Sequence, residues 1–144
     1  MKISTKGIYS LKLMLNLANK YHNNKYISLK TIADEENLSL KYLEKIMLIL
    51  NKKDYFDTCR GIDGGYKLKY DPRKYSIGDI IKTAEGSIAP VHCVEENYSC
   101  PTKKGCSTFK IWKDLDDVIN NHLNNKTLAD YMKGDKDETI IEDK

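Results

Sequence analysis

Between residues 29 and 70 the spacing of apolar side chains changes from a helical to a strand period, which restricts the fold more than any other feature. Two segments of helical period, 29–37 and 40–53, meet at a short break, "NLS". After Asp54 the apolar residues alternate in "YFDTCR" and "YKLKY", on either side of the glycine-rich segment "GIDGG". This alternation predicts an antiparallel hairpin with a tip of about five residues.

Further helices are predicted before and after this unit. An amphipathic helix is expected over 5–22, and another over 77–85, where Gly86 ends it. A long amphipathic helix over 107–124 and a short one over 128–132 complete the pattern. The residues expected to cap helix N-termini are Ser28, Ser39, Ser76 and Thr127.

The order helix, helix, short turn, helix and hairpin is that of a winged helix–turn–helix. We therefore expect a mainly α fold with a small β-hairpin and a long C-terminal helix. Four regions follow: a DNA-binding domain over 1–86, a cysteine loop over 87–106, a dimerisation helix with a short C-terminal helix over 107–133, and an acidic tail over 134–144, expected to be mobile.

The two halves of the chain carry opposite charge. Residues 1–84 contain 16 Lys and Arg against 9 Asp and Glu, whereas residues 85–144 contain 8 against 12. A basic front half is typical of proteins that bind a polyanion such as double-stranded DNA. A lysine-rich solvated surface would give the same count, so charge alone does not decide between the two.

Two parts of the winged unit are expected to contact DNA. The second helix of a helix–turn–helix enters the major groove, and its first turn reaches bases and phosphates. The polar side chains there are Ser39, Lys41, Tyr42 and Glu44. Arg60 stands at the hairpin tip, where its planar fork suits contact within a groove, and Lys67 extends the basic strip. Each of these residues taken alone also fits an ordinary solvent-exposed surface, but their combination favours DNA binding.

Three of the four cysteines lie within 14 residues, in "VHCVEENYSCPTKKGC". Cys93, Cys100 and Cys106 have the spacing C-x6-C-x5-C. From these residues alone a metal site, a redox-active thiol pair and a loop without special chemistry all stay open, although both gaps are wider than those usual for zinc. Cys59 lies in the predicted wing, where we expect a small half-buried strand residue.

The sequence argues against a membrane protein and against an enzyme. It has no apolar run of about 18 residues, and its first 22 residues have a helical period without the small-residue cleavage site of a signal peptide. We therefore expect a cytoplasmic protein whose thiols stay reduced. Only three histidines occur, and neither G-x-S-x-G nor a phosphate-binding loop is found, so no catalytic set is expected.

Several segments together resemble the Rrf-two family of bacterial transcriptional regulators. The most specific are the "STKG" start, "LSLKYLE", the "RG" and "GGY" of the hairpin, and the W-x-D-L of the long helix, and the similarity covers about residues 1–132. It implies a homodimeric repressor or activator that binds a DNA operator. It also makes the long helix the dimer interface, and the apolar stripe of that helix needs a partner in any case. The interface residues would be Phe109, Trp112, Leu115 and Ile119.

The resemblance also gives the cysteine loop a role, because some members of the family hold an iron–sulfur cluster on three cysteines there. The ligands here would be Cys93, Cys100 and Cys106. Two fourth ligands known in the family, a histidine after the last cysteine and an aspartate of the first helix, correspond to Phe109 and Ile8, which cannot bind iron. Three thiolates can hold three irons of a 4Fe–4S cluster and leave the fourth iron exchangeable, whereas a 2Fe–2S cluster needs a fourth ligand, for which His92 is the nearest candidate. We therefore expect a 4Fe–4S cluster with one exchangeable site.

The function expected from the sequence is thus a homodimeric DNA-binding regulator that senses through an iron–sulfur cluster. One alternative is a family member that regulates cysteine metabolism without a cluster, through a partner protein or thiol oxidation. Another is a zinc-stabilised interaction module that does not bind DNA.

Overall fold

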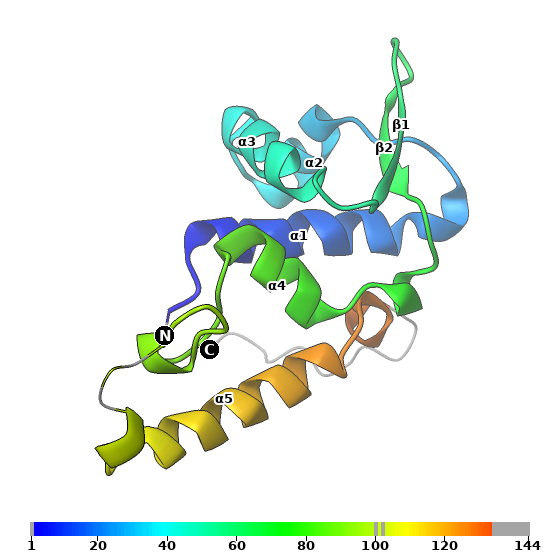
Figure 1. The fold of residues 1–144 in the computed structure, drawn as a ribbon. Coiled ribbons are helices and arrows are strands. Elements are labelled where there is room, and N and C mark those ends of the chain that lie inside the picture. Colours follow the sequence, from blue (N-terminus) through cyan, green and yellow to red (C-terminus); the bar gives the residue numbers. More distant parts are fainter. Residues whose placement is uncertain (1, 100, 102, 134–144) are drawn as a thin grey trace, which may run out of the picture.

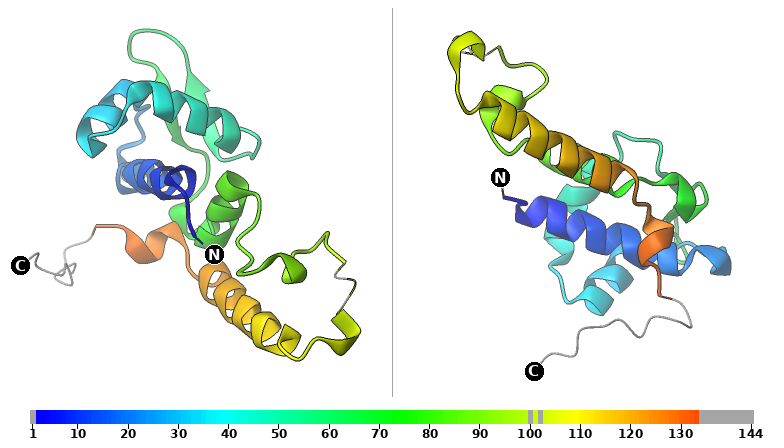
Figure 2. Two further views of the ribbon diagram at one scale, coloured as in Figure 1. Left: turned by 90° about the vertical axis from the view of Figure 1, so that its left-hand side faces the viewer. Right: turned by 90° about the horizontal axis from the view of Figure 1, so that it is seen from below.

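The computed structural model describes residues 2–99, 101 and 103–133, and this part of the chain forms five α-helices and one two-stranded antiparallel sheet. The helices are α1 (Thr5–Asn19), α2 (Leu29–Glu36), α3 (Leu40–Leu50), α4 (Ile77–Glu85) and α5 (Phe109–Asn124), and the strands are β1 (Phe56–Cys59) and β2 (Gly65–Leu68). Figure 1 shows α2, α3 and the hairpin on one side of α1 and α4, and α5 on the other. The hairpin and the cysteine loop project at opposite ends of the molecule (Figure 2).

The predicted fold class is confirmed, and the differences lie at the helix ends. The first helix stops at Asn19 because Tyr21–Asn23 tighten into a 3-10 turn and Asn24 takes a left-handed conformation with φ 51°. The long helix begins at Phe109, two residues later than predicted. The last predicted helix is a 3-10 turn over Leu128–Tyr131.

Side-chain caps begin three of the helices, as the sequence predicts. The hydroxyls of Ser28, Ser39 and Ser76 each accept a backbone N–H three residues later, at 3.1, 3.3 and 3.1 Å. Between α2 and α3, Asn37 has φ 55° and the Leu38 N–H donates to the Ala33 carbonyl at 2.8 Å. These contacts set the turn that directs α3 away from α2.

The core lies where α1 meets α2, α3 and α4. Its fully buried side chains come from every helix except α5, and Leu128 of the last 3-10 turn joins them. The largest are Leu13, Met14, Leu17, Ile32, Leu43, Ile46, Leu50, Ile80 and Leu128. With α1 at its centre, this core holds the helix–turn–helix as a rigid unit.

Backbone pairs fasten the hairpin and α5 to the rest of the chain. Ile27 and Tyr66 exchange two hydrogen bonds of 2.8 Å, which attach β2 to the segment before α2. Beside this pair, Gly65 has φ 151° and lies so close to the Ile27 carbonyl that no side chain fits. The Ile77 N–H donates to the Lys126 carbonyl at 2.8 Å, which ties the end of α5 to the start of α4.

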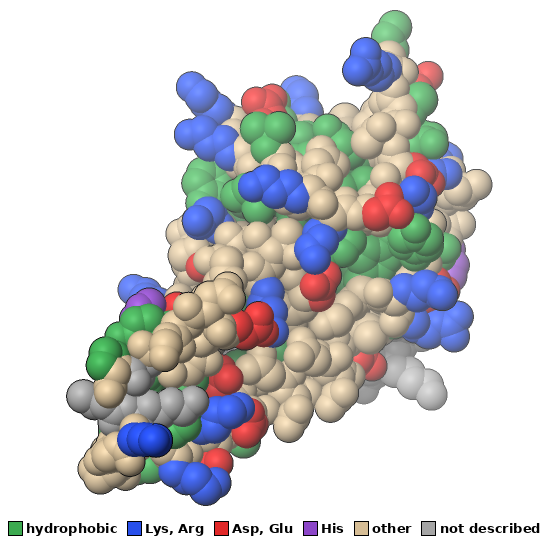
Figure 3. All heavy atoms as spheres, viewed as in Figure 1, with side chains coloured by type: hydrophobic (Ala, Val, Ile, Leu, Met, Phe, Trp, Pro, Cys, Tyr) green, Lys and Arg blue, Asp and Glu red, His purple; other side chains and the backbone are tan. Residues whose placement is uncertain are grey.

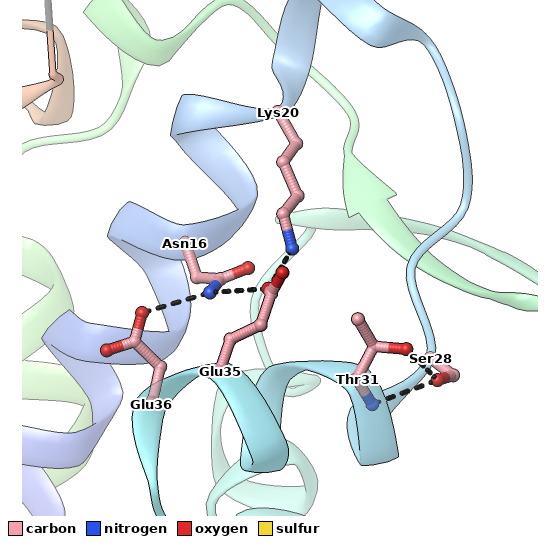
Figure 4. Close-up of polar contacts among 6 residues, drawn as sticks. All are labelled: Asn16, Lys20, Ser28, Thr31, Glu35 and Glu36. Carbon is pink, nitrogen blue, oxygen red and sulfur yellow. Dashed lines mark hydrogen bonds and ion pairs between the residues drawn. The ribbon is translucent and has the colours of Figure 1, made fainter.

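Two polar clusters hold other elements against α1. Asn16 donates from Nδ2 to Glu36 at 2.9 Å and to Glu35 at 3.2 Å, and Lys20 pairs with Glu35 (Figure 4). At the other end of α1 the Glu85 carboxylate accepts hydrogen bonds from the Ser4 N–H, the Ser4 hydroxyl and the Gly7 N–H, at 2.9, 2.6 and 2.9 Å. The first cluster secures α2, and the second secures the C-terminal end of α4.

Candidate nucleic-acid interface and cysteine loop

One face of α3 points into solvent along its whole length. Lys41, Glu44, Lys45 and Leu48 are exposed at spacings of three and four residues, opposite the buried stripe of the same helix. Leu48 is 72% exposed. Lys45 and Leu48 were not among the predicted contact residues, although the helical period that identifies the buried stripe also identifies them.

The other two predicted contacts on α3 are partly used within the protein. Ser39 is exposed at the N-terminus of the helix, where its hydroxyl accepts the Tyr42 N–H. Tyr42 is half-buried, with its ring 5.5 Å from that of Tyr9 in an edge-to-face contact at 84°. The Tyr9 ring therefore orients Tyr42 from α1.

The hairpin provides a second projection beside α3. Arg60 is exposed directly after β1, and Ile62 at the tip is fully exposed. Figure 3 shows basic side chains on the α3 side of the molecule and near the hairpin tip. Lys67 is held nearer the base, where its ammonium donates to the Asn24 side chain at 2.9 Å and lies 4.7 Å from the centre of the Tyr26 ring.

The structure describes two of the three clustered cysteines. Cys93 is half-buried in a 3-10 turn over His92–Val94, and Cys106 is exposed after another over Lys103–Gly105. Cys100 lies outside the described residues. Among the residues that are described, no group of three His, Cys, Asp or Glu side chains is arranged to hold a metal ion.

Local contacts favour the thiolate form of Cys106. The Thr108 hydroxyl lies 3.5 Å from its sulfur, and this contact, followed by the backbone N–H groups of Thr108 and Phe109, lowers the pKa of the Cys106 thiol below its usual value. Thiolate is the form of cysteine that binds metals. Cys59, in contrast, is exposed and not half-buried as expected, because the end of β1 projects from the body of the molecule.

His92 is oriented by two neighbours within the loop. Its Nδ1 lies 3.0 Å from a Glu95 carboxylate oxygen, and its ring centre lies 3.8 Å from that of Tyr98. A carboxylate at one ring nitrogen is the usual partner of a histidine whose other nitrogen binds a metal.

Helix α5 has apolar side chains on two faces. Ile119 packs against the core of its own chain, whereas Phe109 and Trp112 are half-buried and Leu115 is 36% exposed. The face turned to solvent carries Ile111, Leu115 and Val118, and the first and last of these are 57% and 64% exposed.

In the described part of the chain, no helix combines the length and apolar character needed to span a bilayer.

An exposed second helix of a helix–turn–helix, flanked by an arginine-bearing hairpin, is the binding surface of a winged-helix DNA-binding protein. The model of the Rrf2 family, described as an iron-dependent transcriptional regulator, matches residues 3–134. The chain therefore belongs to the Rrf2 family of transcriptional regulators, as its motifs predicted.

Curated relatives agree with this assignment. The chain is 35% identical to Protein rrf2 of Nitratidesulfovibrio vulgaris, over 92% of this chain and 88% of the relative. It is 38% identical to the regulator CymR of Bacillus subtilis, over 95% of this chain and 96% of the relative. It is 34% identical to the regulator IscR of Vibrio vulnificus, over 99% of this chain and 82% of the relative. These relatives are transcriptional regulators and not enzymes, as expected.

Solved structures show the same fold. The structure of B. subtilis CymR, described as the global cysteine regulator, superposes with a TM-score of 0.74 over 91% of this chain and 95% of that chain, at 38% identity. A putative transcriptional regulator from Listeria innocua superposes with a TM-score of 0.77 over 100% and 94%, at 34% identity.

Proposed function

We propose that this protein is a homodimeric regulator that binds a DNA operator and whose affinity is set by an iron–sulfur cluster in the cysteine loop. The exposed face of α3 beside the arginine-bearing hairpin, in a chain of the Rrf2 family, is the observation that carries the proposal. Lys41, Glu44 and Lys45 would face the major groove, and Arg60 a neighbouring groove. Lys67 would neutralise a phosphate only after its ammonium gives up the hydrogen bond to the Asn24 side chain.

The same proposal assigns the dimer contact to α5. Ile111, Leu115 and Val118 form an apolar stripe that its own chain leaves exposed, and burying such a stripe against a two-fold copy is favourable. Phe109 and Trp112 would extend the contact towards the cysteine loop. Ile119 would support it from behind, because it already packs on the core. Two copies joined in this way would present two α3 helices to two half-sites.

The donor chemistry of the loop fits a cluster. Cys93, Cys100 and Cys106 would hold it as thiolates, and the contact with Thr108, which lowers the pKa of the Cys106 thiol, favours that form. An iron–sulfur cluster bound there would supply redox and ligand-exchange chemistry. Because only three thiolates are available, we propose the 4Fe–4S form, with His92 as the candidate for the fourth position.

A second candidate is supported by the similarity to CymR, the global cysteine regulator of B. subtilis. In this case the loop holds no cluster, and a partner protein or oxidation of a cysteine thiol controls DNA binding. The lowered pKa of Cys106 favours this chemistry as well, since the thiolate is the reactive form. The family assignment argues against the zinc module that does not bind DNA.

Anaerobic purification with iron and sulfide analysis separates the two candidates. We expect a coloured protein, and loss of the colour when Cys93, Cys100 or Cys106 is replaced by alanine. Cys59→Ala is the matched control and should keep the colour. A changed spectrum in His92→Ala would identify His92 as a ligand.

DNA binding is tested independently by selecting a site from a random library and measuring the shift of that fragment. A colourless protein that still binds its selected site would support the second candidate. A protein that selects no site would refute both.

A further inference from the structure

A small cavity lies where α4, the cysteine loop and α5 meet. Its volume is about 250 Å³. The loop that follows α4 comes back towards α5 (Figure 1), and its residues Ser87–Ala89 and Val94–Asn97 line the cavity. Cavities that hold drug-sized molecules measure roughly 300–1,000 Å³, so this one suits a smaller ligand.

The inner wall of the cavity carries hydrogen-bond acceptors without partners. Asp116 of α5 lines the cavity and is only 9% exposed. Its carboxylate forms no hydrogen bond or ion pair with a described residue, although Lys113 of the same helix lies within electrostatic range of it. One turn later, Asn120 donates to the Asp116 backbone carbonyl at 2.9 Å, while its Oδ1 is buried without a partner among the described residues. The Asn120 amide oxygen is costly to bury in this way unless a donor reaches it, and the Asp116 carboxylate lines the same cavity.

The other walls add an opposite charge and apolar surface. Lys82 of α4 lines the same cavity, and within the described chain its ammonium is not paired with Asp116 or any other carboxylate. Of the other acidic side chains on the rim, Glu95 is engaged by His92 at 3.0 Å and Glu96 is exposed. Ile88, Ala89 and Val94 supply the apolar part.

We infer that this cavity is a binding site for a free α-amino acid with a small uncharged side chain. The ammonium group of the ligand would donate to Asp116 and Asn120, its carboxylate would pair with Lys82, and its side chain would contact Ile88, Ala89 and Val94. A carboxylate and an ammonium that share one small cavity match the two charges of such a ligand. A singly charged molecule would pair with only one of them, and a neutral molecule with neither.

The position of the site also implies an effect on DNA. Its walls belong to α4, which packs on the DNA-binding core, and to α5, which carries the proposed dimer contact, so an occupant contacts both. This second part rests on the proposed function, whereas binding of the ligand does not. Occupancy would change DNA affinity if it changes the placement of α5 relative to α4.

Titration of the full-length protein with glycine, L-alanine, L-serine and L-valine, up to about 10 mM each, tests the site without DNA. The readouts are the NMR signals of the Asn120 side-chain amide and calorimetry. We expect saturable binding of at least one of the four. Ethylamine and propionate, which each carry one of the two charges of alanine, should bind at least about tenfold more weakly.

Asp116→Asn and Lys82→Met should each weaken binding by at least about tenfold. Asp114→Asn and Lys110→Met, which alter an exposed ion pair of α5 away from the cavity, should leave it within about twofold. If circular dichroism shows that a variant is unfolded, the Asn120 amide signals of the wild-type protein, titrated with the same ligands, still test the proposal. Absence of binding by all four amino acids, equal binding of ethylamine or propionate, or binding unaffected by both cavity variants would overturn the proposal. A protein that binds an amino acid but selects no DNA site would refute the proposed function and leave the ligand site intact.

Discussion

Replacing Glu85 with alanine should destabilise the protein by removing the contact between α4 and the start of α1. The Glu85 carboxylate accepts hydrogen bonds from Ser4 and Gly7 at 2.6–2.9 Å, and it lies at the positive end of the α1 dipole. The carboxylate also packs closely on the backbone of α1, because a Cβ added at Gly7 would lie only 2.6 Å from a Glu85 carboxylate oxygen.

The size of the effect follows from these contacts. A hydrogen bond to a charged group contributes about 1.5–3 kcal/mol when buried. Because this carboxylate is only partly buried, water replaces part of what is lost, and we expect Glu85→Ala to lower the free energy of unfolding by about 2–3 kcal/mol. Glu85→Gln keeps an acceptor and loses the interaction of the charge with the dipole, so it should cost about 0.5–1 kcal/mol.

Equilibrium urea unfolding at one fixed protein concentration measures both values, since dimerisation would otherwise shift the midpoint. Glu44→Ala, which removes an exposed carboxylate of α3, is the control. In a double-mutant cycle, Ser4→Ala should cost less in the Glu85→Ala background than in the wild type. A Glu85→Ala protein as stable as the control, or fully additive effects with Ser4→Ala, would refute this account of the contact.

Three further predictions concern the dimer, the DNA contact and acid stability. Val118→Glu places a charge on the exposed stripe of α5 and should yield monomers in sedimentation, and a variant that stays dimeric would contradict the interface. Arg60→Ala should weaken binding to the selected DNA site by about 1–3 kcal/mol and should weaken binding to random DNA much less. The control is Arg73→Ala, which removes the chain's other arginine, paired with Asp71, and should change neither affinity. The hydrogen bond from Lys20 lowers the pKa of Glu35 below 4.5, so its contribution to stability is complete above that pH and is lost as the pH falls through the lowered pKa. Lys20→Met should therefore flatten the loss of stability between about pH 5 and 3, measured by urea unfolding, and an unchanged slope would refute the assignment.

Much of the fold was determined by residues close together in the sequence. The helical stripes, the serine caps and the glycine-rich hairpin tip each depend on spacings of two to four residues, which backbone hydrogen bonding imposes directly. The exposed face of α3 follows from the same period, which identifies Lys45 one turn beyond Lys41. The family motifs are local in the same sense.

Only the tertiary structure decided contacts between distant segments. Ile119 faces the core and Val118 faces solvent, a choice that depends on how α5 lies against α4, because both faces of α5 are apolar. The hydrogen bond from Ser4 to Glu85 joins residues 81 positions apart in the sequence, and the hydrogen bond from Lys67 to Asn24 joins residues 43 positions apart. Likewise, Lys82 and Asp116 line one cavity only because α4 and α5 pack together. Sequence periodicity specifies which face of an element is apolar, but the neighbour that covers this face is chosen by the packing of the whole chain.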